Sequence, residues 1–227
     1  MSALKIAVIT GGTRGIGRSL VNKFLADGFT VYTSARKAVQ SDHSNLRIFQ
    51  ADLSDKSEVK RFAEWVSQEA NHIDVLINNV GTYIPGKITS EEDGVFETQM
   101  NTNVASTYNV TRALIHLVRK SGKAYIFNIC STASIMPYLD GGSYCISKYA
   151  QLGLTKVLRE ELKADKISVT AVLPGATLTS SWEGTDLPKE RFIDPDSVAQ
   201  LIWTAYQLGD STVIEEILIR PMDGDIV

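Results

Sequence analysis

Residues 4–17, with the sequence LKIAVITGGTRGIG, decide the fold of this chain. The first seven of them are almost all apolar, which is typical of a strand buried on both faces of a sheet. A glycine-rich turn follows, and a helical pattern continues from it to Ala26, where Gly28 ends it. Strand, glycine turn and helix in this order are the setting of a dinucleotide-binding site. The stretch therefore predicts a nucleotide-binding α/β fold.

Each glycine of this turn is expected to have its own role. Gly11 permits the tight turn, Gly15 lets the backbone approach a pyrophosphate, and Gly17 lets the helix pack closely on the sheet. The free amides at the helix start would then face the phosphates. The alternative is an ordinary glycine-rich turn. The predicted cofactor contacts within the turn are Gly11, Thr13, Arg14, Gly15, Ile16 and Gly17.

Strand-like and helical segments alternate along the rest of the chain. With the first strand included, about seven strands are expected, the others at 29–34, 46–50, 73–78, 124–129, 167–173 and 213–219. Helical patterns lie between them, at 55–70, at 91–120 with a break near 100–103, at 143–164 and from Pro195 onward. Such alternation predicts a Rossmann-type, doubly wound parallel sheet with helices on both faces, a three-layer α/β/α fold. We expect one domain spanning residues 1–227.

The end of the second strand indicates which dinucleotide binds. About 20 residues after the glycines, an acidic side chain usually receives the ribose 2′-hydroxyl of NAD. Here the strand runs into Ser34-Ala35-Arg36-Lys37, without a carboxylate. The Arg36 guanidinium suits a 2′-phosphate through forked, charge-assisted hydrogen bonds, and Arg14 could reach the same group. Both arginines could instead be merely solvated, but the missing acid favours NADP(H).

Polar residues at the ends of the next strands are further candidates for the site. Asp52, followed by Leu53, could accept from an adenine amino group or form part of the cap of the helix at 55–70. Asn79, Val80 and Gly81 are expected to lie along the cofactor, whereas a structural role is expected for Asn78. Asn103 stands among apolar residues of a helix, where an asparagine either distorts the helix or serves as a functional amide.

Tyr144 and Lys148 are the candidate catalytic pair. On a helix their four-residue spacing places both side chains on one face, one turn apart. A nearby ammonium favours the tyrosinate, and with help from a bound cofactor's positive charge it could supply the roughly 4 kcal/mol that lowers a tyrosine pKa from about 10 to about 7. The phenol would then exchange protons near neutral pH. Ser131, just after a strand, could hold a substrate oxygen. Taken alone, the pair could equally be a packed ring and a solvated amine.

Composition excludes several classes of protein. The chain has 227 residues, a formal net charge of −3 and a sequence pI near 5.7, and its positive charges are scattered, so a nucleic-acid partner is not expected. Its first residues lack the features of a signal peptide, and no apolar run reaches the about 20 residues of a membrane span. Cys130 and Cys145 fit no metal spacing and are expected to be small buried thiols. A cytoplasmic protein without a metal or a membrane partner is expected.

The ordered set of these motifs resembles the short-chain dehydrogenase/reductase family, over nearly the whole chain. The matching stretches are Thr10 to Gly17, Asn78-Asn79-Val80-Gly81, Asn103, Ser131, Tyr144 to Lys148, and Pro174-Gly175. Val80 departs from the alanine more usual in its motif. The thirteen-residue interval between Ser131 and Tyr144 is the usual one in the family, which selects Ser131 over Ser134 and Ser143.

The resemblance implies a division of labour in which Tyr144 gives its proton to a carbonyl oxygen as hydride arrives from a nicotinamide. Ser131 would hydrogen-bond that oxygen, Lys148 would bind the nicotinamide ribose and tune the phenol, and Asn103 would hold a water that passes protons toward Lys148. The remaining contacts implied on the nicotinamide side are Pro174, Gly175, Thr177 and Thr179. Arg14 and Arg36 match the family's NADP-preferring members.

The leading hypothesis is thus an NADPH-dependent reductase that converts a small ketone or aldehyde to an alcohol. Two alternatives stay open: a non-catalytic NADP-binding sensor, and a 3-oxoacyl-[acyl-carrier-protein] reductase. Residues 176–193 show no clear period and are expected to form a mobile cover over the site, with a plain surface loop as the alternative. The resemblance also implies a homodimer or homotetramer formed through the helices that contain Asn103 and Tyr144.

Overall fold

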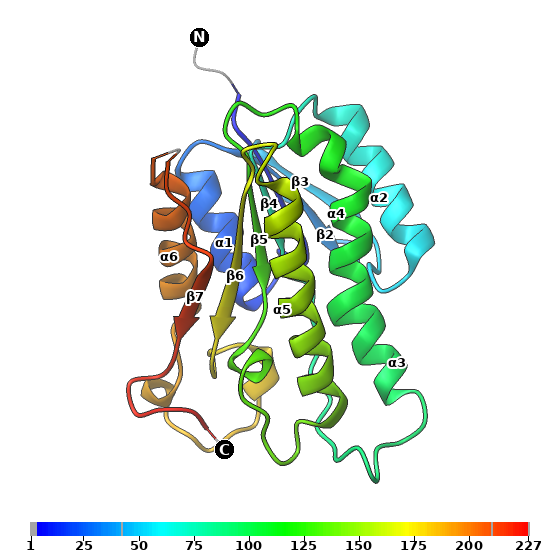
Figure 1. Cartoon of the computed structure of the whole chain (residues 1–227), viewed down its shortest axis with the longest axis vertical. Coiled ribbons are helices and arrows are strands. Elements are labelled where there is room, and N and C mark those ends of the chain that lie inside the picture. Colours follow the sequence, from blue (N-terminus) through cyan, green and yellow to red (C-terminus); the bar gives the residue numbers. More distant parts are fainter. Residues whose placement is uncertain (1–3, 42, 210, 227) are drawn as a thin grey trace.

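The computed structural model describes residues 4–41, 43–209 and 211–226 of the chain, so residues 1–3, 42, 210 and 227 of the expected domain lie outside it. The described residues form a sheet of seven parallel strands in the order β3-β2-β1-β4-β5-β6-β7 (Figure 1). The strands are β1 (Ile6–Ile9), β2 (Thr30–Ala35), β3 (Leu46–Gln50), β4 (Val75–Asn78), β5 (Tyr125–Ile129), β6 (Ser168–Pro174) and β7 (Glu216–Ile219). The predicted Rossmann-type sheet is confirmed.

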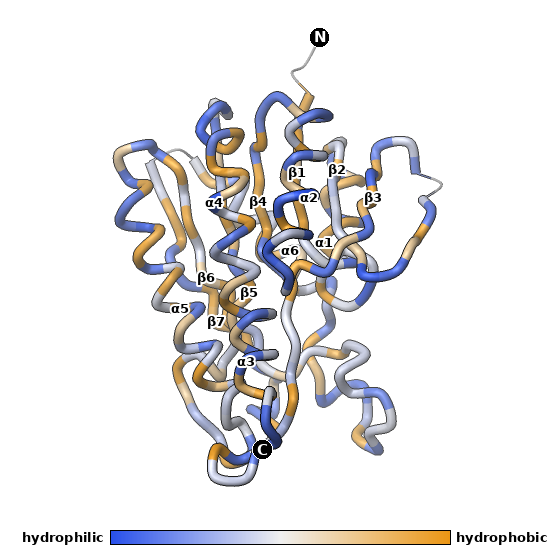
Figure 2. Tube along the Cα trace, turned by 90° about the vertical axis from the view of Figure 1, so that its right-hand side faces the viewer, coloured by the Kyte–Doolittle hydropathy of each residue, from blue (hydrophilic) through white to orange (hydrophobic). Residues whose placement is uncertain are grey.

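Helices cover both faces of this sheet (Figure 1). The helices are α1 (Gly15–Ala26), α2 (Lys56–Glu69), α3 (Val95–Gln99), α4 (Ser106–Val118), α5 (Gly142–Leu162) and α6 (Pro195–Gln207). Apolar residues of α1 and α6 pack on one face, and those of α2 and α4 pack on the other. Burial of these two layers drives the three-layer arrangement, because the central strands β1, β4 and β5 are buried on both of their faces. Figure 2 shows the apolar character of β1 and β4 at the centre of the molecule.

The helix expected over residues 91–120 differs from the prediction. It begins only at Val95, after Gly94 with a φ of 89°, and it is continuous through a π-helical turn, η1 (Met100–Ala105), into α4. The expected break near residues 100–103 is therefore a π-helical distortion, not an interruption. Such wide turns often occur at functional sites because they re-aim side chains without ending the helix.

The order of the strands fixes where a ligand can bind. The chain runs outward from β1 through β2 to β3, and then returns to place β4 on the other side of β1. Parallel α/β sheets bind ligands at this switch point, in the crevice outside the carboxyl ends of the strands. The glycine turn follows β1 and residues 79–81 follow β4, so both candidate segments lie at that crevice.

Candidate active site

The glycine turn after β1 adopts a conformation that depends on its glycines. Gly11 and Gly15 have φ angles of 67° and 51°, a region that strains any residue with a Cβ. A Cβ on Gly17 would lie 2.3 Å from the Gly11 carbonyl oxygen and 2.5 Å from Asn79 Nδ2. The turn is therefore closely packed against the start of α1, as the sequence predicts.

Neighbouring strands hold this turn in place through polar side chains. The Gly11 and Gly12 amides donate to Ser34 Oγ (3.1 Å) and Thr33 Oγ1 (2.9 Å) on β2. Asn79 Nδ2 donates to the Gly11 carbonyl at 3.2 Å, and the Asn79 amide donates to Thr10 Oγ1 at 2.9 Å. The turn and the end of β4 are thus joined, which places Asn79, Val80 and Gly81 beside the glycines.

The start of α1 fits a phosphate group. The first turn of a helix leaves amide groups without partners within the helix, and they carry partial positive charge. In α2 and α6 the caps Asp55 and Asp194 accept from such an amide, whereas α1 has no side-chain cap. The amides that follow Arg14 are therefore available to an anion, and a dinucleotide pyrophosphate is the anion that this strand–turn–helix setting binds.

The two candidate arginines lie at this end of the site. Arg14 and Arg36 are exposed and follow the adjacent strands β1 and β2. Among the described residues, no carboxylate forms an ion pair with either guanidinium. Both charges are therefore free to meet a phosphate, and that role stays a prediction.

Asp52 does not have one of the two roles predicted for it, since it is not the cap of α2. Its carboxylate accepts from the Ser54 amide (3.0 Å) and Ser54 Oγ (2.7 Å), and it does not cap α2. The cap is Asp55, which accepts from the Ser57 amide at 2.7 Å. Asp52 is exposed at the carboxyl end of β3, so its adenine role stays a prediction, while the adjoining Leu53 is buried in the core.

Tyr144 and Lys148 lie together, as their spacing predicts. Lys148 Nζ is 5.8 Å from the centroid of the Tyr144 ring, and both residues belong to the first two turns of α5. Lys148 is buried, whereas Tyr144 remains partly accessible to solvent. The alternative of a solvated amine is wrong, because the amine is inside the protein.

The expected acidic phenol is not what this geometry produces. Burial raises the pKa of Tyr144 to about 12, and a hydrogen bond with Ser131 opposes that shift. Burial also lowers the pKa of Lys148 to about 8. The difference arises because both groups lose hydration on burial, whereas the prediction also relied on the positive charge of a bound cofactor. In the protein alone, Tyr144 therefore carries its proton at neutral pH.

Ser131 is the serine placed to act with Tyr144. It lies before the 3₁₀ turn η2 (Thr132–Ser134), and its Oγ accepts from the Ala133 amide at 3.1 Å. The two rejected serines have other partners. Ser134 Oγ accepts from the Ser131 amide at 3.2 Å, and Ser143 bonds the Glu91 carboxylate through both its amide and its hydroxyl.

Asn103, in the π-helical turn, is a fully buried amide that holds the loop after β4. Its Oδ1 accepts from the Thr82 amide at 2.7 Å, and its Nδ2 donates to the Thr82 carbonyl (3.0 Å) and to Ser147 Oγ (2.8 Å). The predicted helix distortion is confirmed, and a functional role of the amide stays a prediction. These contacts already use the side-chain amide of Asn103. Its role in holding a relay water stays a prediction.

The segment after β6 reaches the glycine turn. A Cβ on Gly15 would lie 3.0 Å from Thr179 Cγ2. Residues 176–193 are tied at their ends by a bridge between Thr177 and Ile193, and they contain two 3₁₀ turns, η3 (Ser180–Trp182) and η4 (Lys189–Arg191). Pro174 ends β6, and Gly175 donates its amide to the Ile219 carbonyl at 2.8 Å. The segment therefore begins beside the site, whereas its mobility stays a prediction.

Several residues of the site were not singled out from the sequence. Tyr83 packs edge-on against Tyr144 with ring centroids 4.9 Å apart, and it hydrogen-bonds Tyr138. Gln99, one turn before Asn103, pairs with both the amide (3.2 Å) and the carbonyl (3.3 Å) of Ile84. The four-residue spacing of Gln99 and Asn103 was the available signal, because two amides at that spacing share one helix face.

The structural roles predicted for Asn78 and the cysteines are confirmed. Asn78 Nδ2 donates to Thr111 Oγ1 (3.0 Å) and Asn128 Oδ1 (2.8 Å) inside the core. Cys130 and Cys145 are both buried, and burial raises the pKa of Cys130 to about 11, so this thiol is neutral at physiological pH.

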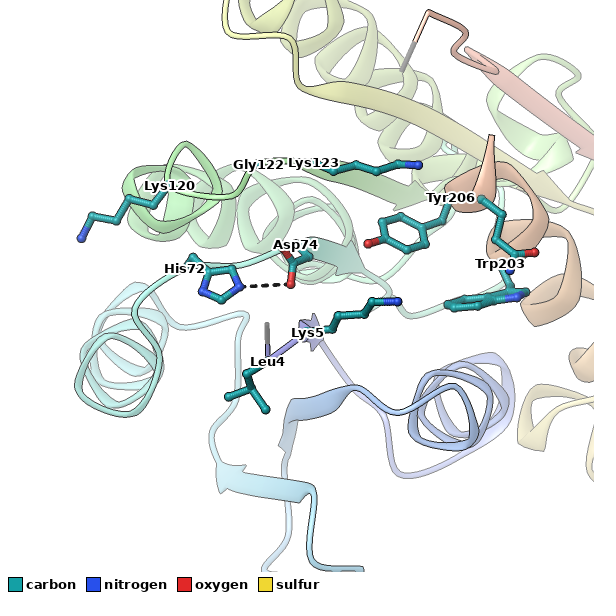
Figure 3. A pocket seen from close by; sticks show the side chains of 10 residues that line it. Leu4, Lys5, His72, Asp74, Lys120, Gly122, Lys123, Trp203 and Tyr206 are labelled. Atoms are coloured by element: carbon teal, nitrogen blue, oxygen red, sulfur yellow. Dashed lines mark ion pairs between the residues drawn. The ribbon is translucent and has the colours of Figure 1, made fainter. Parts of the chain in front are cut away.

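A separate cavity of about 670 Å³ lies at the opposite edge of the sheet, near the amino ends of β1 and β4 (Figure 3). His72 Nε2 pairs with Asp74 Oδ2 there at 3.2 Å, and Asp74 also accepts from the Ile6 amide. None of the predicted site residues lines this cavity. Within the described ranges, no helix is long and apolar enough to cross a membrane, and no group of three His, Cys, Asp or Glu side chains is placed to hold a metal ion.

Comparison with known proteins identifies one family and several relatives of this chain. The profile of a family described as short chain dehydrogenase matches residues 5–189. The chain is 30% identical to sepiapterin reductase of Chlorobaculum tepidum, with 97% of this chain and 98% of that protein covered. It is 33% identical to a 3alpha-hydroxysteroid dehydrogenase of Mediterraneibacter gnavus over 77% of this chain and 74% of that one.

Solved structures with the same fold include proteins determined in complex with NADP. The chain superposes on a Pseudomonas aeruginosa RhlG/NADP active-site complex with a TM-score of 0.87 and 26% identity, covering 96% of this chain and 95% of that one. A metagenomic short-chain oxidoreductase in complex with NADP gives a TM-score of 0.81 and 26% identity, with 96% and 97% covered.

Proposed function

The chain belongs to the short chain dehydrogenase family, and from that membership we propose that it is an NADPH-dependent reductase of ketones or aldehydes. One observation carries the proposal. The Tyr144 phenol, hydrogen-bonded to Ser131 and beside a buried Lys148, lies on the sheet edge that carries the glycine turn. A proton donor and the turn proposed to hold the dinucleotide thus lie at the same edge of the sheet.

NADPH, when bound, supplies the hydride that reduces the carbonyl carbon. The residues of the chain supply the rest: Ser131 donates a hydrogen bond to the carbonyl oxygen, and Tyr144 transfers its proton to that oxygen as negative charge develops there. The carbonyl thereby gains two electrons and two protons, a hydride on its carbon and a proton on its oxygen, and becomes an alcohol. Because burial keeps the phenol protonated at neutral pH, the resting site suits the reduction direction.

NADP(H) is the proposed cofactor for two reasons. Relatives of the same fold, at 26% identity, were solved with NADP. In this chain the second strand ends without a carboxylate, and Arg14 and Arg36 are exposed at the carboxyl edge of the sheet, suited to a 2′-phosphate. Residues 176–193 are proposed to cover the bound cofactor, since Thr179 lies beside the glycine turn, where it would meet a Cβ on Gly15.

A homodimer or homotetramer is proposed from the surface of the helices around the site. Large apolar side chains on α3, α4 and α5 are exposed, and such a group on adjacent helices is typical of an interface. These residues are Phe96, Tyr108, Ile146, Tyr149 and Val157. Light scattering at micromolar concentration tests the assembly, and a monomer at all concentrations would contradict it.

The function is tested by mixing the purified protein with NADPH and a panel of ketones and aldehydes. Loss of NADPH absorbance with at least one carbonyl, and formation of the alcohol, are the expected results. An aldehyde or ketone panel without any turnover, together with tight NADPH binding, would favour the NADP-binding sensor. Turnover restricted to 3-oxoacyl groups on a carrier protein would favour the acyl-carrier reductase.

A further inference from the structure

The ammonium of Lys148 is held inside the protein by two acceptors. Nζ donates to the Ile129 carbonyl at the end of β5 (3.0 Å) and to Gln151 Oε1 one turn further along α5 (2.8 Å). Lys148 is 4% exposed and Gln151 is 0% exposed. A charge that has lost its water in this way persists only if its N–H groups find partners. Gln151 therefore supplies one of the two hydrogen-bond acceptors that take the place of water around this ammonium.

The amide of Gln151 cannot rotate freely. Its Nε2 donates to Thr107 Oγ1 at 3.0 Å, and the Thr107 hydroxyl donates to the Asn103 carbonyl at 3.3 Å. A flipped amide would aim two N–H groups at the ammonium and lose the bond to Lys148. The hydrogen bonds therefore run in one direction, from Lys148 through Gln151 and Thr107 to the π-helical turn.

The remaining N–H of Lys148 is left for the cofactor crevice. An ammonium has three donors, and two of them point to Ile129 and Gln151. Nζ lies 3.6 Å from the position that a Cβ on Gly81 would take, in the segment predicted to line the cofactor. Fixing two donors thus fixes the direction of the third.

We infer that Gln151 is a positioning residue, which holds the Lys148 ammonium charged and aimed at the crevice and couples it to the π-helical turn through Thr107. Its effect on turnover rests on the proposed function, whereas its effect on the titration of Lys148 does not. No motif quoted from the sequence includes Gln151 or Thr107.

The sign of the effect follows from the groups that face Lys148. The titratable ones are the Tyr144 phenol on its own helix and the Cys130 thiol after β5, and both are neutral at pH 7 because burial raises their pKa values. The charge is therefore supported by neutral acceptors. Removing the Gln151 carbonyl disfavours the ammonium, and so the pKa of Lys148 falls further below its ordinary value.

The test measures the titration of Lys148 directly, by NMR of lysine labelled with ¹³C at Cε, in the protein without cofactor. The signal is assigned by its loss in Lys148→Met. Gln151→Leu should lower the Lys148 pKa by about one unit, the scale expected for a lost hydrogen bond to a charged group. Gln151→Glu places a carboxylate against the ammonium and should raise it. Gln68→Leu, an exposed glutamine on α2, is the matched control and should change nothing.

Thr107→Val tests the coupling and also serves if Gln151→Leu does not fold. It preserves the volume of the side chain but frees the Gln151 amide, so a smaller decrease of the same sign is expected. An unchanged Lys148 pKa in every folded variant at positions 107 and 151 would overturn the inference.

Turnover provides the second measurement. Gln151→Leu should move the alkaline limb of the pH profile of kcat/KM to lower pH and raise the KM for NADPH, and Gln151→Glu should move that limb the other way. A purely structural role would change the melting temperature without moving the limb. If no carbonyl is reduced but the pKa shifts occur, the proposed function fails and this inference stands. If carbonyls are reduced but the pKa values do not shift, this inference fails and the proposed function stands.

Discussion

The two ends of the proposed crevice are built differently. At the reaction end, Asn103, Ser131 and Lys148 are buried, and each has hydrogen-bond partners within the protein. At the phosphate end, Arg14 and Arg36 are exposed, and the start of α1 has no side-chain cap. The reaction end is therefore organised before any ligand arrives, whereas the phosphate end has groups that only a ligand would satisfy.

This difference predicts how each end of the crevice responds to amino-acid substitution. Removing one member of a buried polar network costs function and leaves its partners unsatisfied, and the net change in stability also depends on whether a buried charge is removed with it. An exposed guanidinium contributes little to folding, so its removal affects binding alone. The predictions below use that contrast, from the largest expected effect to the smallest.

Tyr144→Phe removes the phenolic hydroxyl, with its proton and its hydrogen bond to Ser131, and leaves the ring in place. General acid catalysis contributes about 10²–10⁴-fold, so kcat/KM should fall by that factor while the melting temperature changes little. Steady-state kinetics and thermal unfolding measure the two effects. Tyr149→Phe, an exposed tyrosine on the same helix, is the control. Retention of full activity in Tyr144→Phe would remove the phenol from the mechanism.

Gly17→Ala introduces a Cβ within 2.3 Å of the Gly11 carbonyl oxygen, so the glycine turn must shift. Overpacking of this kind costs about 1–3 kcal/mol, and NADPH binding should weaken with it. Gly153→Ala on α5, where nothing lies within 4 Å, should be neutral or stabilising. Denaturant unfolding and NADPH titration distinguish the two variants. Equal stability of both would show that the turn is loosely packed.

Lys148→Met should abolish turnover but stabilise the fold near neutral pH. The pKa of Lys148 falls from 10.5 to about 8 on folding, so the buried charge costs roughly 3 kcal/mol below pH 8. The variant should gain about 1–2 kcal/mol there, since it also leaves two acceptors unpaired.

The pH dependence of this gain provides its check. Between pH 8 and 10.5 the unfolded chain binds a proton that the folded chain has released, so wild-type stability rises with pH and the advantage of Lys148→Met shrinks. Denaturant unfolding at pH 7, 9 and 10.5 measures this. A variant less stable than the wild type at every pH would contradict the cost assigned to the buried ammonium.

Arg36→Ala should change cofactor preference without changing stability. Losing a charge-assisted hydrogen bond to a 2′-phosphate should reduce the NADPH/NADH ratio of kcat/KM by roughly tenfold. Lys37→Ala, its exposed neighbour, is the control. An unchanged ratio in Arg36→Ala would show that the end of β2 does not select the cofactor.

Much of the fold was predictable from the sequence because its signals are local. Apolar runs and turn residues marked all seven strands, and Asp194 with Pro195 marked the start of α6. The boundary errors arose where tertiary contacts decide. Gly94 starts α3 four residues later than periodicity suggests, and the π-helical turn depends on Asn103 and Gln99 meeting the loop after β4.

The site was predictable in its members but not in its electrostatics. The spacing of Tyr144 and Lys148 placed them correctly, because helix geometry alone decides that contact. The pKa of the phenol in the cofactor-free protein lies above its ordinary value, which the sequence did not indicate, since the extent of burial depends on elements far away in the sequence. Gln151 was missed for the same reason, because its partner Thr107 lies on a different helix.

Transfer of deuterium tests the central claim most directly. NADPH carrying two deuterium atoms on the reactive carbon of its nicotinamide is incubated with the protein and a carbonyl that the protein reduces, and the alcohol is analysed by mass spectrometry. We expect one deuterium on the carbinol carbon with the wild type and no measurable product with Tyr144→Phe in the same time. An alcohol without deuterium, or equal product from both proteins, would contradict hydride transfer at this phenol.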